Sequence, residues 1–509
     1  DGVYTQIQFE NIPYLRGLES SFGLESIPGS WIESIQITKG AGNVVNGYES
    51  MAGLINLEFE KPTEMDLFYM NAYQNRLGRS ELNLRSGVEL NEKWSTGIFG
   101  YVSSNWLEND ENKDGFRDMP IGSNFSFVNR YSYEGKKMEA KFGLNIHTDA
   151  KMGGQLGTTP ENQIGSGYGV NLNNDHIDFF LKSGFFGKKP SQSLGIVTNI
   201  KYQRLDGFFG DRYYGGLEKR GYVNLIYDDY IGTTDHRVQC GASFTYIDIF
   251  QATDSLTDSR IEMIPGVFGE YTYTGPRLTT VLGLRYDEHL LYGGQLSPRV
   301  HLKYKASERT DIRVTSGKGW RVPNYIIDNV SLLANQFQWV APSETQPEIS
   351  WNIGTSIYQE FDLFDREATI TVDFYRTWFE NQLIVDRESD VIRFINQQGG
   401  SFSNAFQSEI DFSPFQRFEV RIAYKFLDVK ATFGDSTISA RDVPTQSNIF
   451  KYGVSDDGLK SKIDDVIGNF SDNTSTSSMF EEASTVSYES ALQNRSKYQD
   501  LLNKFHSGS

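Results

Sequence analysis

The sequence predicts an all-β protein: a transmembrane antiparallel β-barrel that holds a compact N-terminal unit in its lumen. Three observations support this fold class. Apolar and polar residues alternate along most of the chain up to Phe433, short and long connections alternate between the expected strands, and a compact glycine-rich stretch at residues 27–57 precedes them. Alternation with a period of two residues indicates strands that have one apolar and one polar face.

The N-terminal unit is expected at residues 1–62. Within residues 27–57 a hydrophobic strand is followed by a Lys39-Gly40 turn, a second glycine turn and another hydrophobic strand. Glycine permits positive φ, so these turns can be tight. A small sheet that fits inside a pore is therefore predicted here.

The barrel is expected at residues 63–433, with about 17 strands near the ~10-residue length of a tilted membrane strand. Residues 236–246, 299–304 and 419–426 show the alternation most clearly. A soluble antiparallel sheet would show the same pattern. Connection lengths favour the barrel, because short turns on one side and long loops on the other are typical of outer-membrane barrels. The expected long loops are 107–124, 148–175, 205–219, 250–261, 287–295, 324–347 and 386–400.

The last segment, residues 434–509, is predicted to be a non-barrel tail. It is rich in Ser, Asp and Asn, and the alternation stops. A disordered or helical extension explains this composition. A shifted reading frame or an unrelated join is the alternative that we favour, because an odd strand count cannot close an up-and-down antiparallel barrel.

Composition excludes several classes of protein. Hydrophobic residues make up 38% of the chain and the mean hydropathy is −0.46; no run approaches the ~18 apolar residues of a transmembrane helix. A net charge of −18 argues against a nucleic-acid partner. A single cysteine, Cys240, excludes an intrachain disulfide and a Cys-based zinc site. The chain carries no phosphate-loop, HExxH or GxSxG motif, so no enzymatic activity is expected.

Specific motifs give a family resemblance. The segment IESIQITKGAGNVVNGYESMAGLINLEFEKP carries Lys39-Gly40, Asn46-Gly47, Gly53 and Ile55-Asn56. It resembles the C-terminal half of the plug domain of TonB-dependent outer-membrane receptors. Three barrel segments resemble strands of the same family: LSPRVHLKY (296–304), GKGWRVPN (317–324) and QPEISWNIG (346–354). The phrases NVVNGYESMAG and DGFRDMP are most similar to receptors of Bacteroidetes.

The resemblance implies a barrel of about 22 strands in the bacterial outer membrane, with the plug in its lumen. On this reading the chain is truncated at both ends, and the coupling segment, half of the plug and the last strands are missing. The expected function is energy-coupled import of a scarce nutrient such as a ferric siderophore, a metal chelate or a cobalamin. The expected partners are the TonB-ExbB-ExbD complex, the ligand and outer-membrane lipid, and no cofactor is required.

Three alternatives remain open at this point. A passive porin would lack the plug-like residues 1–62. An outer-membrane enzyme would bring a reactive serine or an acidic pair together on one face of the barrel. A soluble adhesin would stay in buffer without detergent.

Candidate ligand contacts come from segments that are expected to face outward. In the family, the segment equivalent to residues 4–27 lies between two plug strands that face the ligand. Aromatic and arginine side chains in loops could bind a ligand, form an interfacial girdle or pack the loops. The candidates are Phe9, Tyr14, Arg16 and Phe22 in the plug, Arg212, Tyr213 and Tyr214 in FFGDRYYGG, and Trp339.

Two groups of residues could bind metal. Asp110, Asn112, Asp114 and Asp118 place oxygen ligands at positions 1, 3, 5 and 9 of a calcium-type loop with Gly115 at position 6. Position 12 is an isoleucine, which lowers the expected affinity, and an Asx-rich turn is the alternative. The second group comprises His147, Asp149, Met152 and His176, whose ligand types suit copper or iron; chance clustering is the favoured explanation.

Overall fold

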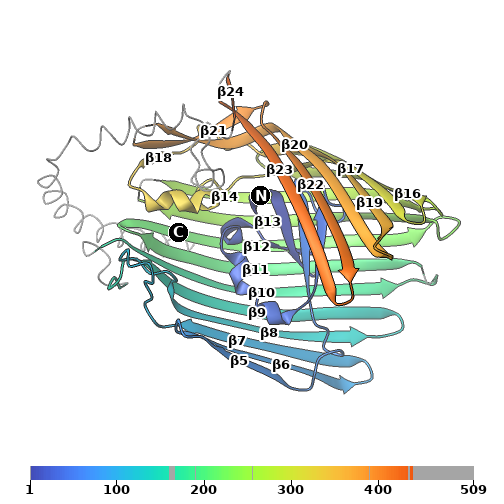
Figure 1. Ribbon diagram of the computed structural model, residues 1–509, viewed down its shortest axis with the longest axis horizontal. Coiled ribbons are helices and arrows are strands. Elements are labelled where there is room, and N and C mark those ends of the chain that lie inside the picture. Colours follow the sequence, from blue (N-terminus) through green and yellow to red (C-terminus); the bar gives the residue numbers. More distant parts are fainter. Residues whose placement is uncertain are drawn as a thin grey trace, which may run out of the picture.

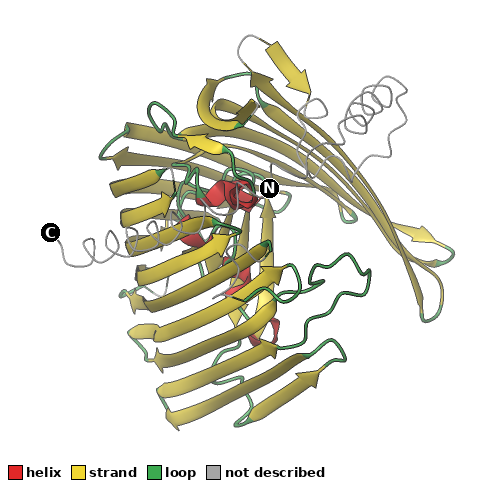
Figure 2. Ribbon diagram, turned by 90° about the vertical axis from the view of Figure 1, so that its left-hand side faces the viewer, coloured by secondary structure: helices red, strands yellow, loops and turns green. Residues whose placement is uncertain are grey.

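The computed structural model describes residues 2–159, 167–189, 191–254, 256–388, 390–433 and 436–439. An N-terminal unit of short elements lies inside a large antiparallel sheet (Figures 1 and 2). Most of the predicted tail, from residue 440 onward, lies outside the described residues. In the part of the chain that is described, no helix is both long and apolar enough to cross a membrane.

The N-terminal unit, here called the plug, is built on a four-stranded sheet in the order β2-β1-β4-β3. Strand β1 runs parallel to β4, with Thr5 opposite Gly53 and Phe9 opposite Leu57. Tight turns become possible where residues adopt positive φ, as at Gly40 (80°) and Gly47 (111°). The elements are the 3-10 helices η1 (Gly2–Tyr4), η2 (Gly17–Glu19), η3 (Gly23–Ser26) and η4 (Gly29–Trp31), and the strands β1 (Thr5–Phe9), β2 (Ile12–Leu15), β3 (Ile32–Lys39) and β4 (Gly53–Phe59).

The barrel sheet contains the remaining described strands in chain order from β5 to β24, but β17 pairs directly with β19 and β20 with β22. Strand β18 pairs in parallel with β21. One further 3-10 helix, η5 (Ile327–Ala334), lies in the connection between β17 and β18. The strands are β5 (Tyr69–Gln74), β6 (Arg79–Asn91), β7 (Trp94–Asn105), β8 (Ile121–Glu134), β9 (Met138–Gly154), β10 (Gly169–Phe186), β11 (Ser193–Phe209), β12 (Arg212–Tyr230), β13 (His236–Thr253), β14 (Thr257–Thr274), β15 (Leu278–His289), β16 (Gly293–Ser307), β17 (Thr310–Arg321), β18 (Gln338–Val340), β19 (Glu348–Leu363), β20 (Arg366–Glu388), β21 (Val391–Gln398), β22 (Phe402–Phe415), β23 (Phe418–Phe433) and β24 (Ser436–Ser439).

The two faces of the barrel sheet have opposite chemistry. Charged side chains such as Arg130, Lys201 and Asp287 point inward and are almost fully buried against the plug. Large apolar side chains point outward; Ile200 is 59% exposed and Val267 is 56% exposed. An apolar outer face and a polar lumen are what a barrel needs when lipid replaces water around it. The predicted fold class is therefore confirmed.

Several strands continue where the sequence predicts long loops. Residues 205–219 form the end of β11, a tight turn and the start of β12, while β13 and β14 occupy most of residues 250–261. Residues 287–295 likewise form a tight connection between β15 and β16. Beyond the membrane both faces of a strand meet water or polar neighbours, so the alternation that identifies a strand fades there. The long connections that remain are 106–120, 155–168 and 322–347.

The barrel sheet also extends past its predicted end at Phe433. Strand β24 pairs with β23 in antiparallel fashion, with Ser436 opposite Phe433 and Ser439 opposite Lys430. The sequence TIS that it contains is too short for its alternation to be recognised.

Replacing the outward Val267 with arginine should destabilise the barrel in a bilayer. Val267 lies near the middle of β14, so the substitution is expected to lower the free energy of unfolding by about 2–4 kcal/mol. Tyr273→Arg, close to the short-turn end of the same strand, should cost about 0–1 kcal/mol. Urea unfolding in lipid vesicles measures both variants, and equal losses would contradict the assignment of the outer face to lipid.

Candidate ligand site at the plug–barrel interface

A buried carboxylate anchors the plug to the barrel wall. Glu19 lies at the end of η2, and its side chain is fully buried. His176 Nδ1 of β10 lies 3.0 Å from one carboxylate oxygen, and Lys201 of β11 forms an ion pair with the other. Burial alone would raise the pKa of Glu19, but Lys201 and His176 outweigh it, so the pKa of this carboxyl lies well below its usual range. Glu19 therefore stays charged inside the lumen.

Tyr14, a predicted ligand contact, belongs to the same network. Its hydroxyl donates to Asp178 Oδ2 at 3.1 Å and lies 3.2 Å from His176 Nε2. Arg220 donates to the Tyr14 carbonyl at 2.9 Å, and the Lys201 ammonium lies 4.5 Å from the centre of the Tyr14 ring. We call Tyr14, Glu19, His176, Asp178, Lys201 and Arg220 the latch. Three of its members belong to the central strands β10 and β11, which positions it beside the middle of the barrel wall.

A second ion pair holds the other side of the β1–β2 hairpin. Glu10 has a φ of 50° at the tip of the hairpin, and its carboxylate lies 2.6 Å from Arg130 Nη1 on β8. Both side chains are buried. Lys182 donates to the Glu10 carbonyl at 2.8 Å. Side chain and backbone of one turn residue are thus both held by cations of the barrel.

The glycine-rich plug loop between β3 and β4 is held through its carbonyl groups. Arg299 of β16 donates to the carbonyls of Gly42 at 3.1 Å and Tyr48 at 3.2 Å. Arg285 of β15 donates to the Val44 carbonyl at 3.3 Å and pairs with Asp287 at 2.6 Å. The loop is thus fixed by two arginines of the barrel wall through its backbone, whichever side chains it carries.

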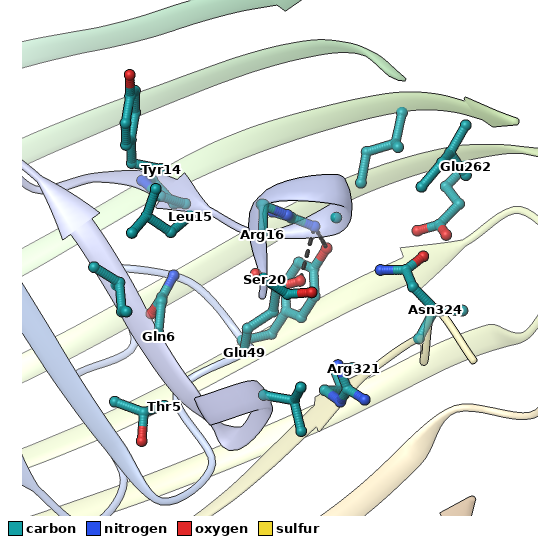
Figure 3. A pocket seen from close by; sticks show the side chains of 18 of the residues that line it. Thr5, Gln6, Tyr14, Leu15, Arg16, Ser20, Glu49, Glu262, Arg321 and Asn324 are labelled. Atoms are coloured by element: carbon teal, nitrogen blue, oxygen red, sulfur yellow. Dashed lines mark hydrogen bonds and ion pairs between the residues drawn. The ribbon is translucent and has the colours of Figure 1, made fainter. Parts of the chain in front are cut away.

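A small cavity lies between the plug and strands β13, β14 and β17 (Figure 3). Arg16 forms an ion pair with Glu49 at 2.8 Å and donates to the Tyr48 hydroxyl at 3.1 Å. Burial raises the pKa of Glu49 even though Arg16 opposes the shift. The cavity measures about 60 Å³, which is room for a few water molecules but not for a chelate.

A larger pocket of about 570 Å³ opens between the plug and the first barrel strands. It lies at the end of the barrel that carries the long connections. Glu81 links its wall residues, because its carboxylate pairs with Arg79 and accepts a hydrogen bond of 3.0 Å from the Tyr101 hydroxyl. Across the pocket Lys151 pairs with Asp149 at 2.9 Å. Its further lining consists mainly of small polar residues: Ser30, Asn71, Asn83, Ser103, Ser104, Asn105, Ser123 and Asn124. This volume is typical of a small-molecule site.

The structure brings some predicted contacts together. Arg212 donates to the Phe337 carbonyl at 2.7 Å, and its guanidinium lies 5.7 Å from the Trp339 ring centre. Tyr213, Tyr214 and Trp339 are buried, at 6%, 0% and 2% exposure. The predicted loop at residues 205–219 is thus a packed hairpin, and these aromatics form part of the wall.

The predicted plug contacts are mostly interior. Phe9 is buried with its ring centre 4.2 Å from that of Phe59, and Phe22 packs beside η5. Tyr14 and Arg16 line the small cavity. None of the predicted aromatic or arginine contacts lines the larger pocket, so their contact with a ligand stays a prediction.

The four residues considered for copper or iron binding contact other protein groups in the described structure. His147 and His176 stack with ring centres 5.0 Å apart, Asp149 pairs with Lys151, and Met152 is buried. Within the described ranges, no group of three or more His, Cys, Asp or Glu side chains is arranged to hold a metal ion.

The calcium-type loop is folded by its own side chains. The Asp110 carboxylate accepts hydrogen bonds from the backbone N–H groups of Asp114 at 3.1 Å and Gly115 at 3.0 Å. Asn112 donates to Asp114 Oδ2 at 2.9 Å, and Asp118 accepts from the Glu111 N–H at 2.7 Å. These contacts are those of an Asx-rich turn. Calcium binding by the loop stays a prediction.

Sequence reasoning missed Glu19 and Lys201, which fix the plug at η2. Glu19 sits in a polar stretch and resembles a surface acid, and its partner Lys201 is remote in the chain. A usable signal existed on β11, where Lys201 occupies the inward face between Asn199 and Gln203. Charged residues on lumen positions of a plugged barrel need partners on the plug.

An N-terminal unit held by ion pairs inside a many-stranded barrel sheet is the architecture of an outer-membrane receptor. The family model described as "TonB dependent receptor-like, beta-barrel" matches residues 60–448, and the chain belongs to this family. Members of the family are transporters of the outer membrane rather than enzymes, and membership implies ligand binding and coupling to TonB.

Solved structures share the fold at low sequence identity. The siderophore receptor PirA from Acinetobacter baumannii gives a TM-score of 0.64 at 12% identity over 83% of this chain and 72% of that chain. A variant of the ferric enterobactin receptor PfeA from Pseudomonas aeruginosa gives 0.62 at 13% over 84% and 74%. The alcaligin receptor FauA from Bordetella pertussis gives 0.59 at 12% over 85% and 72%. No curated protein matches the sequence.

Removing the Glu19 charge should loosen the plug. Glu19→Gln leaves Lys201 buried without its carboxylate partner, which should lower the free energy of unfolding by about 3–5 kcal/mol. Denaturant titration of the chain in detergent, followed by tryptophan fluorescence, measures the loss. Glu25→Gln is the matched control, because Glu25 is 56% exposed in its pair with Lys151 and should cost less than about 1 kcal/mol. Equal small losses would show that the latch does not hold the plug.

Proposed function

We propose that this chain forms the plug-and-barrel part of a TonB-dependent receptor in the bacterial outer membrane. Its cargo is a scarce nutrient such as a ferric siderophore, another metal chelate or a cobalamin. The observation that carries the proposal is the latch: a plug fixed by buried charge blocks passive flow, so cargo passes only when work is done on the plug. The siderophore receptors of the same fold support this class of cargo, and the plug sequence supports a receptor of Bacteroidetes type.

The buried ion pairs explain why coupling to an energy source is needed. Breaking one buried pair without replacing its partner costs about 3–5 kcal/mol. The plug is held by at least two such pairs, Glu10–Arg130 and Glu19–Lys201. Thermal motion alone would release it rarely. A pull from the TonB-ExbB-ExbD complex, together with rehydration of the freed charges, supplies the free energy that is needed to break these ion pairs.

The larger pocket is the better place for cargo. The cavity at Arg16 holds only a few waters, whereas the larger pocket has the volume of a small-molecule site. Its carboxylates and cations already pair with one another, and serine and asparagine supply most of its remaining polar groups. Such a wall recognises a ligand through hydrogen bonds to oxygen and nitrogen atoms rather than through excess charge. Phe9, Tyr14, Arg16, Phe22, Arg212, Tyr213, Tyr214 and Trp339 would then contact cargo after the plug moves.

Filling the larger pocket should abolish binding. The chain in detergent is titrated with a ferric catecholate, a ferric hydroxamate and a cobalamin, and bound ligand is measured by calorimetry. Ser103→Trp places a bulky ring in the pocket and should weaken binding of the recognised ligand at least about tenfold, since the pocket loses much of its volume.

Val102→Trp is the control for this test, because Val102 is 44% exposed on the outer face of the same strand. It should leave the affinity unchanged. Equal affinity of both variants would exclude the pocket, and failure of all three ligand classes to bind would argue against the proposed cargo.

We also propose that the loop at Asp110 takes up calcium at external concentrations. Extracellular loops of this type bind with a dissociation constant of about 0.1–1 mM. Calorimetric titration with calcium should give such a value, and Asp110→Asn should abolish the heat. Glu111→Gln serves as the control, because Glu111 pairs with Arg76 outside the ligand positions. A titration without heat would leave the loop an Asx-rich turn.

A further inference from the structure

The wall of the larger pocket carries more acidic than basic side chains. Its charged lining residues are Glu25 of the plug, Arg79 and Glu81 of β6, and Asp149 and Lys151 of β9. Both cations already pair with acids, because Arg79 pairs with Glu81 and Lys151 pairs with Asp149 and Glu25. The wall would have no positive excess even if Asp149 took up a proton. In the described part of this wall, an anionic ligand therefore meets no cation that lacks an acidic partner.

Uncharged polar side chains occupy neighbouring inward positions of the same wall. Ser103 of β7 lies opposite Asn124 of β8, and Asn71 of β5 lies opposite Asn83 of β6. Asn105 lies two residues after Ser103 and therefore on the same face of β7. Amide and hydroxyl groups can both donate and accept hydrogen bonds. The pocket thus suits a ligand that presents neutral oxygen and nitrogen groups.

Two acceptor atoms of the lining lack a donor. Asn105 donates to the Pro120 carbonyl at 2.7 Å, whereas its Oδ1 is buried without a hydrogen-bond partner. The Oδ1 atom of Asp149 is likewise buried without a partner. Among the lining residues that the structure describes, these are the buried side-chain atoms left unpaired, and both are acceptors. A buried acceptor without a donor is unfavourable, so a ligand that brings hydroxyl or N–H groups gains free energy once a small side-chain rotation turns either oxygen toward it.

The mouth above the larger pocket is acidic as well. Met119 and Pro120 of the connection 106–120 line the pocket. This connection contains five acidic and two basic residues, and Arg76 from the β5–β6 turn pairs with its Glu111. Calcium in the loop, as proposed above, would neutralise the remaining negative charge without creating a positive excess. An anion that approaches the pocket therefore finds no field of opposite sign to steer it.

We propose that the larger pocket selects cargo that has no net negative charge and presents hydroxyl or N–H groups. The inference rests on the proposed function, since it narrows the cargo of that site. Among iron chelates it favours a neutral trihydroxamate, in which three hydroxamate anions balance Fe³⁺. It disfavours a tris-catecholate, in which three doubly charged catecholates leave a trianion. Such a trianion would lose its hydration in the pocket and meet acids instead of free cations.

The test titrates the chain in neutral detergent with two iron chelates at physiological ionic strength and measures binding by calorimetry. The probes are a neutral ferric trihydroxamate that carries peptide N–H groups and a ferric tris-catecholate. The trihydroxamate should bind at least about tenfold more tightly, because the trianion gains no counter-charge in the wall. Each titration is repeated with Ser103→Trp, which fills the pocket and shows whether the observed binding occurs there.

Reversing the charge of the wall should relax this selection. Glu25→Gln/Asp149→Asn nearly preserves the size of both side chains and removes both acidic partners of Lys151. The affinity for the tris-catecholate should then rise at least about tenfold, because the wall gains a positive excess. The affinity for the trihydroxamate should change less than about threefold, because asparagine keeps the acceptor oxygen. This retained binding also shows that the variant folds.

Glu89→Gln/Glu92→Gln is the matched control. It removes the same amount of charge at the short turn between β6 and β7, at the opposite end of the barrel. Both affinities should stay unchanged, since salt screens exposed charges that are farther apart than about 8 Å. An equal gain in tris-catecholate affinity in this control would reveal an effect of net charge alone and overturn the role of the pocket wall.

The outcomes separate this inference from the proposed function. Tris-catecholate binding that matches or exceeds trihydroxamate binding, and that Ser103→Trp abolishes, would overturn the inference but leave the proposed cargo intact. If neither iron chelate nor a cobalamin binds, the proposed cargo fails and the inference fails with it. Preferential trihydroxamate binding that weakens in Ser103→Trp, together with the gain of tris-catecholate binding in the charge-reversed wall, would support both.

Discussion

Charge buried between plug and barrel is the constraint on which this structure depends. A lumen lined by arginine, lysine and carboxylate side chains cannot be left dry and unpaired, because an isolated buried charge is strongly unfavourable. Glu10 and Glu19 on the plug form ion pairs with Arg130 and Lys201, respectively, on the barrel wall. Because each pair joins a particular strand to a particular turn, the plug has one orientation. Apolar packing at Phe9 and Phe59 then fills the space that the ion pairs define.

The same pairs suit a part that has to move. Buried ion pairs add little net stability compared with apolar contacts of the same volume, yet losing one partner is expensive. Water can replace the missing partner, whereas it cannot replace an apolar neighbour. Buried ion pairs therefore hold the plug in place while water is excluded from the interface. They release the plug more readily once water enters, as a gate inside a pore requires.

Much of the fold follows from local pattern. Alternation identified both faces of strands such as β13 and β16. The contrast between short and long connections favoured the barrel, although three of the connections expected to be long, 205–219, 250–261 and 287–295, are tight in the structure. The ends of β11 to β14 next to their shared connections were predicted as loops. In β11 and β12 the reason is that Gly207, Gly215 and Gly216 suggest a loop, although they are paired in extended strands. The candidate site was harder to predict from the sequence. Tyr14 was expected to face outward toward a ligand, but its side chain is only 2% exposed. Its partners come from the neighbouring strands β10, β11 and β12, and only the packing of the plug against these strands brings Tyr14 to residues so distant in the sequence.

Unequal strand lengths give the molecule a direction. Strands β9 to β14 have 17 to 19 residues, whereas β6, β7, β15 and β17 have 12 or 13. At about 3.3 Å per residue, the longer strands rise well above a membrane core of about 30 Å. The wall formed by β9 to β14 therefore stands higher above the membrane core than the stretches at β6 and β7 on one side of it and at β15 and β17 on the other. A solute that moves along the cell surface would meet the taller wall or enter over the shorter stretches beside it, so access to this protein is from the side as well as from above.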